Sequence, residues 1–408
     1  MSEPIKSGPF LGINNKLPSE KLIVPKEGAF VRDAVNVDLT SAGTFQRRGG
    51  TTKVLTATRA SSLWASGNTG KAYFVDSGAL KSFDGTSAAL IKTLSDSSAT
   101  ASFTDTPRGV VWSDGTALEL ITGNTSVPLG VPAPNPTPLA TAATDGSLLA
   151  GTYLVAFANV DAAGVRSPVS LFQAVTVGAN GAINIALPTR AYSTQVFVSA
   201  VNGTELYYET SISATATSAV ISLVTSQGVP ADNEYEDAMP AGTMVRYYRG
   251  RLLTVRGNAV FYSHPYHYAL TYPARNFILL DGPITLCEPT QTGVFLATAN
   301  DTWFLDGLDV ATAELKPLAP YGAIAGTVAY EPNSLNMWWM TPRGMVRTSD
   351  ANTLELKQDE NIAFGTANTG AALFREENGL SQVISALSNA VPSGAASASS
   401  YMDAVTVN

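Results

Sequence analysis

The sequence predicts an almost entirely β-structured chain, and three observations support this fold class. Short apolar stretches are interrupted roughly every 8 to 12 residues by Gly, Asn, Asp or Pro, the spacing of antiparallel hairpins. Amphipathic helical periodicity is weak, and its best candidates are two short segments, 370–376 and 379–386. A sequence unit from one half of the chain also recurs in the other half.

Three segments have the pattern of a strand, a turn and a second strand. They are KAYFVDSGALKSFDG at 71–85, GRLLTVRGNAVFYS at 250–263 and GVFLATANDTWFLDG at 293–307. Each has small or polar turn residues between two apolar runs. We expect each of the three segments to form a β-hairpin.

The recurring unit is TPRGVVWSD at 106–114, which returns as TPRGMVRTSD at 341–350. With one inserted residue, both copies run on to LEL. This recurrence indicates one supersecondary unit used in both halves, although chance similarity of two hairpins is an alternative. Units of about 40 to 50 residues that hold several hairpins and no helix favour the four-stranded blades of a β-propeller. A long series of β-sandwiches is the alternative fold.

A different kind of sequence separates the two halves. The segment 127–140, VPLGVPAPNPTPLA, contains too many prolines for a helix or a central strand. After it come strand-like segments at 151–170, 182–188, 193–210 and 217–224. They total about 100 residues, the size of an immunoglobulin-like sandwich. The segment 151–170 resembles the B and C strand region of fibronectin type III-like modules, although it has no Cys pair and no core Trp.

The predicted organisation therefore has four parts. Residues 1–50 are an N-terminal arm and first strand, 51–130 the first part of the propeller, 131–238 an inserted fibronectin III-like or immunoglobulin-like sandwich, and 239–408 the second part. About 250 residues remain for the propeller, which gives about five to six blades of about 45 residues each. We expect the terminal strand Tyr401–Val407 to close the first blade.

Composition limits the possible functions. The chain has 25 basic and 33 acidic residues, a net charge of −8, and only 14% charged residues, against about 25% in average globular chains. Its surface is therefore covered by small polar residues or hidden in subunit contacts. Cys287 is the only cysteine, so a disulfide framework is excluded. The start, MSEPIKSGPFLG, lacks an apolar signal core, and we expect the chain to fold in a cytosol.

Few residues point to catalysis or metal binding. His264 and His267 are the only histidines, and they lie in a Tyr- and Pro-containing segment without a third nearby Cys or His, so we expect surface or interface histidines. The acidic segments 232–240 and 357–363 lack the spacing of a calcium loop and are interpreted as solvated connections. There is no nucleotide-binding or nucleophile-elbow motif. We expect no enzyme, cofactor or metal. We also expect the hairpin aromatics to pack in cores, a carbohydrate-stacking platform being the alternative.

The segment 12–50, GINNKLPSEKLIVPKEGAFVRDAVNVDLTSAGTFQRRGG, resembles the opening of the tail hub or nozzle proteins of short-tailed bacteriophages. These are also called packaged-DNA stabilisation or head-completion proteins. In that family such a segment leads into a β-propeller. The matching residues are Ala34, Asn36, Asp38, Gly43, Phe45, Arg47, Arg48 and Gly50, and Gly49 replaces a usual proline. The proline-rich linker with an inserted sandwich is also similar to phage tail proteins.

The resemblance implies a virion structural protein of the tail, assembled in the cytoplasm of a bacterial host. Several subunits, usually six, would form a ring below the portal and adaptor proteins, carry tail fibres or a spike, and retain and conduct packaged double-stranded DNA without sequence-specific binding. An acidic wall would let DNA slide, because cationic contacts to phosphate add affinity. The basic residues of the arm are then expected to dock onto an acidic neighbour; they are Lys6, Lys16, Lys21, Lys26 and Arg32. The candidate assembly interface is Lys16, Lys21, Arg32, Asn36, Asp38, Arg47 and Arg48.

Two other functions stay open. A tail fibre or receptor-binding tail protein that contacts host surface glycan would be favoured by an exposed aromatic groove. A secreted or periplasmic propeller enzyme or lectin would need the signal peptide that the sequence lacks.

Overall fold

Strands make up nearly all the regular structure of this chain. The computed structural model describes residues 9–40, 42–50, 52–225, 228–231, 236–332, 334–349, 353–363, 367–377, 379–388 and, for the backbone alone, 401–407. Lys6 and residues 232–235 of the acidic segment lie outside these ranges. Within them, the only helix is the 3-10 turn η1 (Ser19–Lys21). None of the described helical structure is long and apolar enough to cross a membrane.

The chain divides into two compact units. One consists of Met1–Thr56 together with Leu280–Asn408, and we call it the terminal unit. The other is Ala57–Leu279, which we call the central unit. The terminal unit therefore joins the two ends of the chain.

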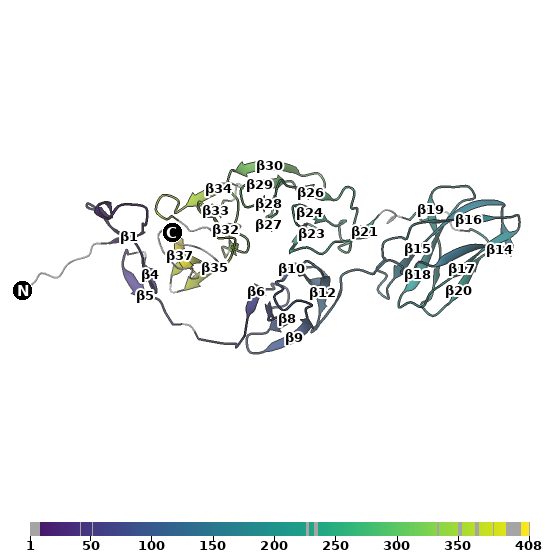
Figure 1. Ribbon diagram of the computed structural model, residues 1–408, viewed down its shortest axis with the longest axis horizontal. Helices are drawn as coiled ribbons and strands as arrows, with labels where there is room; N and C mark the ends of the chain where they lie inside the picture. The colour runs from purple at the N-terminus through teal and green to yellow at the C-terminus, as the bar shows by residue number, and fades with distance from the viewer. Residues whose placement is uncertain are drawn as a thin grey trace, which may run out of the picture. The chain divides into compact units, whose positions relative to one another are not determined.

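The central unit contains three four-stranded antiparallel sheets built from strands in or nearly in chain order (Figure 1). The first has the order β6 (Ala60–Ala65), β7 (Ala72–Asp76), β8 (Ala79–Phe83), β9 (Ala88–Thr93). The second has β10 (Ser102–Thr106), β11 (Gly109–Ser113), β12 (Leu118–Thr122), β13 (Thr125–Pro128). The third has β22 (Met244–Tyr248), β23 (Arg251–Arg256), β24 (Ala259–Tyr262), β26 (Phe277–Leu279), while β21 (Asp237–Ala238) pairs with β25 (Leu270–Thr271).

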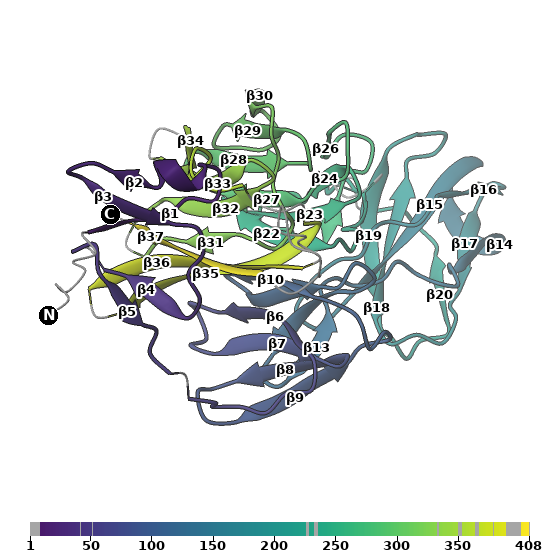
Figure 2. The ribbon, with the colours of Figure 1, turned by 60° about the vertical axis from the view of Figure 1, so that its left-hand side comes forward.

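The terminal unit repeats this design (Figure 2). One sheet has the order β27 (Leu286–Pro289), β28 (Gly293–Ala297), β29 (Thr302–Asp306), β30 (Glu314–Ala319), and the next β31 (Ala329–Tyr330), β32 (Met337–Thr341), β33 (Gly344–Thr348), β34 (Leu354–Lys357). A three-stranded sheet follows, with β35 (Thr369–Glu377), β36 (Leu380–Ser388) and β37 (Tyr401–Val407). The N-terminal segment adds β1 (Phe10–Ile13), β3 (Gly28–Val31) and β2 (Ile23–Val24) in one sheet, and β4 (Val37–Leu39) with β5 (Phe45–Arg47) in another.

Neighbouring sheets pack face to face because their inner strands are apolar on both sides. In β11, Val111 and Trp112 are both fully buried, yet they belong to different cores. Trp112 packs with residues of β7 and β10, and Val111 packs with residues of β22 and β23. Successive side chains of a strand point to opposite faces, so one apolar dipeptide supplies two interfaces.

In the terminal unit, β32 likewise buries two adjacent apolar residues on opposite faces of its sheet. Trp338 packs in a core with Val383 and Leu387 of β36, whereas Trp339 packs with Phe295 of β28. The expectation that hairpin aromatics form cores is thus confirmed for these residues. It is also confirmed for Tyr73, Phe74, Trp112 and Phe304, which are all buried.

The three predicted hairpins are present, and the two copies of the recurring unit have the same turn. Thr106 ends β10 and Thr341 ends β32. In each turn the threonine hydroxyl donates to the carbonyl of the glycine three residues later, at 2.8 Å. The copies nevertheless differ in position, because the first joins strands one and two of its sheet and the second joins strands two and three. The repeat is therefore a hairpin rather than a whole sheet.

Both helical candidates are wrong. Residues 370–376 and 379–386 lie in β35 and β36, which pair antiparallel from Thr369 opposite Ser388 to Glu377 opposite Leu380. Gly379 has the positive φ of 78° that a tight hairpin turn requires. Pairing and burial of β36 in the sheet override the weak helical pattern, which had no capping signals to support it.

The C-terminal strand also differs from expectation. β37 pairs with β36, from Ser381 opposite Val407 to Leu387 opposite Tyr401, and not with a strand of the first four-stranded sheet. The edge of β36 is closer to β37 in sequence than any strand of the first four-stranded sheet, and pairing of segments close in sequence costs less chain entropy.

Seven strands between the second and third sheets of the central unit form two further sheets. One has β14 (Leu139–Leu148), β17 (Gly181–Ala186) and β20 (Ser218–Ile221), and the other has β16 (Gln173–Val177), β15 (Gly151–Val160), β18 (Ser193–Ser199) and β19 (Leu206–Ile212). Both sheets contribute to one core, which includes Tyr153, Phe157, Ile183, Ile185 and Val196. We call these strands the inserted module. Its first strand, β14, was missed because it is rich in Ala and Thr and follows the prolines directly.

We predict that residues 131–238 fold without the rest of the chain, because the inserted module has a core of its own. In this fragment Phe157→Ala should lower the free energy of unfolding by about 3–5 kcal/mol, since Phe157 is fully buried. Val220→Ala, at an exposed position of β20, should change it by less than about 0.5 kcal/mol. Urea unfolding followed by circular dichroism measures both, and a fragment without a cooperative transition would contradict the prediction.

Candidate functional site

The predicted assembly segment is organised around one buried carboxylate in the terminal unit. Asp38 is only 3% exposed. Its Oδ1 accepts hydrogen bonds from Nε of Arg48 at 3.0 Å and from Nε2 of Gln382 at 3.3 Å, and its Oδ2 accepts one from Nη2 of Arg375 at 3.1 Å. Arg375 and Gln382 belong to β35 and β36, so Asp38 fastens the N-terminal segment to the last sheet.

The charge state of Asp38 follows from these partners. Burial by itself raises the pKa of a carboxyl group. The hydrogen bonds from Arg48 and Gln382, together with the charges of Arg48 and Arg375, outweigh burial and hold the pKa of Asp38 below its ordinary value of 3.8. Asp38 is therefore ionised at neutral pH and stabilises the folded chain.

Other residues of the family-like segment have local structural roles. Asn36 has a left-handed φ of 58°, and its carbonyl accepts a hydrogen bond from the Arg48 amide at 3.1 Å. Gly43 has a φ of 71°, and a Cβ there would lie 2.8 Å from Cβ of Pro9, so glycine is required. The Phe45 ring packs on Phe10, with 4.2 Å between ring centroids. The motif thus encodes a fixed hairpin.

The arm before this hairpin is held by the acidic segment 357–363. Asn14 Nδ2 donates to Oδ1 of Asn361 at 2.9 Å, and the Ala363 amide donates to Oδ1 of Asn15 at 2.6 Å. Nζ of Lys16 contacts the carbonyl oxygen of Asp359. This segment therefore does more than the solvated connection that the sequence predicted, since it binds the N-terminal arm of the same chain.

The seven candidate interface residues fall into two groups. Asp38 and Arg48 bind each other inside the chain. Five are exposed, namely Lys16, Lys21, Arg32, Asn36 and Arg47. Among these, Arg32 donates to the carbonyl of Leu17 at 3.0 Å. Large aliphatic side chains accompany the exposed group, with Ile23 71% and Val35 79% exposed.

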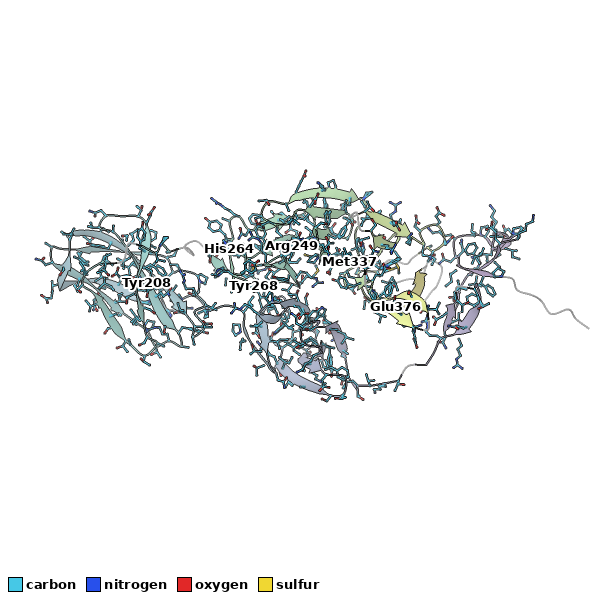
Figure 3. The ribbon with its side chains drawn as sticks, turned by 180° about the vertical axis from the view of Figure 1, so that it is seen from behind. Tyr208, Arg249, His264, Tyr268, Met337 and Glu376 are labelled. Carbon is cyan, nitrogen blue, oxygen red and sulfur yellow. The ribbon has the colours of Figure 1, made fainter. Side chains whose placement is uncertain are left out.

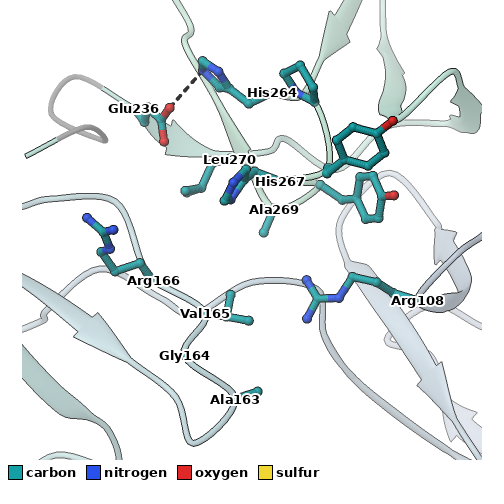
Figure 4. Close-up of a pocket in the computed structure, with 13 residues that line it drawn as sticks. Arg108, Ala163, Gly164, Val165, Arg166, Glu236, His264, His267, Ala269 and Leu270 are labelled. Atoms are coloured by element: carbon teal, nitrogen blue, oxygen red, sulfur yellow. Dashed lines mark ion pairs between the residues drawn. The ribbon is translucent and has the colours of Figure 1, made fainter.

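A second site lies in the central unit, around the histidine pair. A hollow of about 590 Å³ is lined by two stretches of the chain and by two single residues (Figure 4). They include Arg108, the loop 163–166, Glu236 and the loop 264–270. The sequence identified the two histidines but not their neighbours, because Arg108, Arg166 and Glu236 are brought together only by the fold.

Local structure fixes the backbone near three of the lining residues. Arg108 sits in the recurring Thr-Pro-Arg-Gly turn, where its amide donates to Oγ1 of Thr106 at 3.2 Å. Arg166 follows a turn closed by Asp161, whose Oδ1 accepts from the Val165 amide at 2.8 Å. Glu236 directly precedes β21, which pairs with β25 at the end of the histidine loop.

Tyr266 has an unusual conformation at the edge of this hollow. Its φ is 63°, which is rare for an aromatic residue. The Tyr266 amide donates to the carbonyl of Gly250 at 2.6 Å, and a Cβ at Gly250 would lie 3.1 Å from the Tyr266 ring. The ring is therefore held against Gly250, and yet the residue is 71% exposed.

The polar groups of the hollow differ in protonation. Nε2 of His264 lies 2.9 Å from Oε1 of Glu236 (Figure 4). Burial and the nearby charge of Arg251 lower the pKa of His264, whereas the adjacent Glu236 carboxylate favours the protonated ring. Burial and a hydrogen bond with Tyr247 raise the pKa of Tyr268 to about 12, so its hydroxyl keeps its proton. Figure 3 shows His264 and Tyr268 on neighbouring parts of the central unit.

A metal centre is not formed by these residues. In the part of the chain that the structure describes, no group of three or more His, Cys, Asp or Glu side chains is placed to hold a metal ion. Cys287 is buried and is not part of a disulfide.

No family model matches the chain, and no curated protein does. Similar solved structures include the Pan2 WD40 domain of Neurospora crassa, which is 11% identical, covers 79% of this chain and 85% of that chain, and has a TM-score of 0.33. A structure of BBS1N in complex with ARL6DN is 9% identical over 81% and 89%, with a TM-score of 0.32. An ancestral GH74 enzyme is 10% identical over 85% and 71%, with a TM-score of 0.21. At such low TM-scores these likenesses identify neither a family nor an activity.

We predict that Asp38→Asn lowers the free energy of unfolding by about 1.5–3 kcal/mol at pH 7, the size of a hydrogen bond to a charged group. Because folding lowers the pKa of Asp38, its stabilising contribution is present above pH 3.8 and is lost as the pH falls below that value. The variant and the native chain should therefore become equally stable in acid.

Urea unfolding at a series of pH values measures this difference, and amide hydrogen exchange reports whether residues 28–48 open first. Glu20→Gln, at an exposed position of η1, is the matched control and should have no effect. A native stability advantage that persists at pH 2 would contradict the assignment to Asp38.

Proposed function

We propose that the sheets of both units are blades of one β-propeller with about five to six blades, into which a fibronectin III-like or immunoglobulin-like sandwich is inserted at 131–238. The described residues contain five four-stranded sheets of this kind and one three-stranded sheet. Their inner strands bury both faces, as the residue pairs in β11 and β32 illustrate. Antiparallel sheets of four consecutive strands stacked face to face are the building principle of propellers.

We further propose that the protein is a non-enzymatic structural protein of a bacteriophage tail, located in the virion. In this proposal it forms a ring of about six copies below the portal and adaptor proteins, carries fibres or a spike, and retains and conducts packaged DNA. One observation carries the proposal. The segment that resembles phage tail hub proteins is ordered and is bound to the last sheet through Asp38. Its cationic and aliphatic side chains are exposed.

The geometry of this segment suits contacts between subunits. β2 and β5 are edge strands with unpaired backbone groups on one side, and short exposed edges of this kind accept strands from other chains. Ile23 lies on β2, and Arg47 lies at the end of β5. The segment thus exposes both an apolar and a cationic side chain, and protein interfaces combine an apolar core with a polar rim.

The charge of the chain supports the proposed role in DNA passage. The net charge is −8, and only 14% of residues are charged. Few cationic side chains are then available to contact phosphate. The inner surface of the proposed ring would therefore bind a DNA duplex only weakly, whatever its sequence.

A receptor-binding tail protein that contacts host surface glycan is the second candidate. The hollow around the histidine pair favours it, because Tyr266 presents an exposed aromatic ring beside convergent polar side chains.

We predict that the double variant Lys21→Glu, Arg47→Glu folds normally but no longer forms rings on the portal–adaptor complex of its phage. Both side chains are exposed, so their reversal should cost little stability, whereas like charges facing an acidic neighbour repel it. Light scattering and negative-stain microscopy of the mixed proteins measure ring formation. Arg256→Glu, an exposed arginine at the end of β23, is the matched control and should still assemble.

Deletion of residues 1–30 should have the same effect on assembly, but it also removes the contacts of Asn14 and Asn15 with the segment 357–363. The point variants are therefore the sharper test. Complete rings formed by the double variant, or a native chain that ignores the portal–adaptor complex, would remove the basis of the ring proposal.

A further inference from the structure

We propose that neighbouring copies of this chain join by strand addition, in which residues 52–57 of one copy pair with the outer edge of β37 in the next copy. We call residues 52–57 the connecting segment, because the boundary between the two units, after Thr56, falls within it. The inference rests on the ring proposed above and names a contact between its subunits.

The accepting edge belongs to a sheet that has one strand fewer than its counterparts. Five sheets of the two units have four strands each, and in each of them a fourth strand lies beyond the third. The sheet of β35, β36 and β37 ends at β37, and within the described residues no strand lies beyond it. The outer N–H and C=O groups of β37 therefore form an edge to which one more strand can be added.

β37 also lacks the features that protect the other outer strands from pairing. Its seven residues pair with β36 without a register shift. By contrast, β13 contains Pro128, β30 contains Pro317 and a register shift, β9 has a register shift, and β26 and β34 have only three and four residues. Prolines, bulges and short length are the usual protection of sheet edges against other chains. β37 is thus the outer strand best suited to accept a partner.

The connecting segment has the composition of a strand but forms none. Its sequence, TKVLTA, has no Gly, Ser or Pro, the residues typical of flexible linkers, and contains the strand-favouring residues Thr52, Val54 and Thr56. Five of its six residues are exposed, and Val54 is 71% exposed. In Figure 1 the chain runs from β5 to β6 as a plain trace. Its backbone groups are therefore available to a sheet edge.

The connecting segment is held on both sides. Before it, the Arg48 amide donates to the carbonyl of Asn36 at 3.1 Å. After it, the amides of Thr58 and Arg59 donate to Oδ1 of Asp76 at 3.0 and 2.9 Å. A segment restrained at both ends loses less conformational entropy on pairing than a free arm would.

A second copy fits this edge for three reasons. The donating segment and the accepting edge are different surfaces of one chain, so each copy can donate to one neighbour and accept from the other, which is the contact that closes a ring. The only charged residue of the connecting segment is Lys53, and the only one in β37 is Asp403, so the two strands have opposite charges. The segment also follows Arg47, a residue of the candidate assembly interface, after only four residues.

The first test compares two double variants, Val54→Pro with Thr56→Pro and Lys53→Pro with Leu55→Pro. Successive N–H groups of a strand point to opposite sides, so each variant removes donors from one side only. Proline is tolerated in an edge strand where its nitrogen faces solvent. We therefore expect one double variant to need at least about tenfold more protein to form rings on the portal–adaptor complex, and the other to assemble like the native chain.

Lys53→Gln measures the effect of the lost charge alone, and circular dichroism with urea unfolding confirms that every variant is folded. Negative-stain microscopy and light scattering measure assembly. Equal behaviour of the two proline variants would overturn strand addition, because a plain linker has no preferred side.

The second test identifies the partner strand by photo-cross-linking in the assembled rings. A benzophenone amino acid is placed at Val54, and chains labelled with ¹⁵N are mixed with unlabelled chains before assembly. Mass spectrometry should then find the peptide that contains 401–407 linked to the connecting segment, with one labelled and one unlabelled partner in about half of the products when the two chains are mixed equally.

Rings in which Val54 links to another part of the chain, or to 401–407 of the same copy, would overturn strand addition while the ring proposal stands. A native chain that forms no ring would overturn the ring proposal itself, and with it this inference. Microscopy of the native chain therefore distinguishes the two failures.

Discussion

The two-residue period of the β-strand is the constraint on which the rest of the structure depends. When two adjacent residues of an inner strand are both large and apolar, they must be buried on opposite faces of the sheet. Val111 and Trp112, and again Trp338 and Trp339, therefore each require a neighbouring sheet on both sides. A chain with such pairs in successive hairpins has to stack its sheets, and stacked sheets leave loops and turns free to carry function.

The N-terminal segment shows how a polar contact completes such a stack. A buried, well-paired carboxylate joins the segment to the last sheet. Removing a charge from water is costly, and it is tolerated here because three donors from two parts of the chain converge on Asp38. These contacts of Asp38 leave the exposed lysines, arginines and aliphatic residues of the segment available to other chains.

The hollow in the central unit depends on the same scaffold in another way. Its cations come from turns between strands, and these turns are rigid because threonine and aspartate side chains bind the backbone within them. The same turn chemistry occurs around Arg343 in the terminal unit, where the guanidinium packs over a tyrosine ring. One hairpin design thus presents an arginine at both places, and the surroundings determine what that arginine contacts.

The sequence alone determined the local structure of three hairpins. Alternating apolar residues and Gly, Asn or Asp turns specified the hairpins at 71–85, 250–263 and 293–307, because strand period and turn chemistry are local properties. Only the tertiary structure decided that 370–376 and 379–386 are strands, that β37 pairs with β36, and that Asp38 meets Arg375. It also brought Arg108, Arg166 and Glu236 to the histidine pair. These outcomes depend on contacts between residues far apart in the chain, and the periodicity of a single segment carries no information about its distant partners.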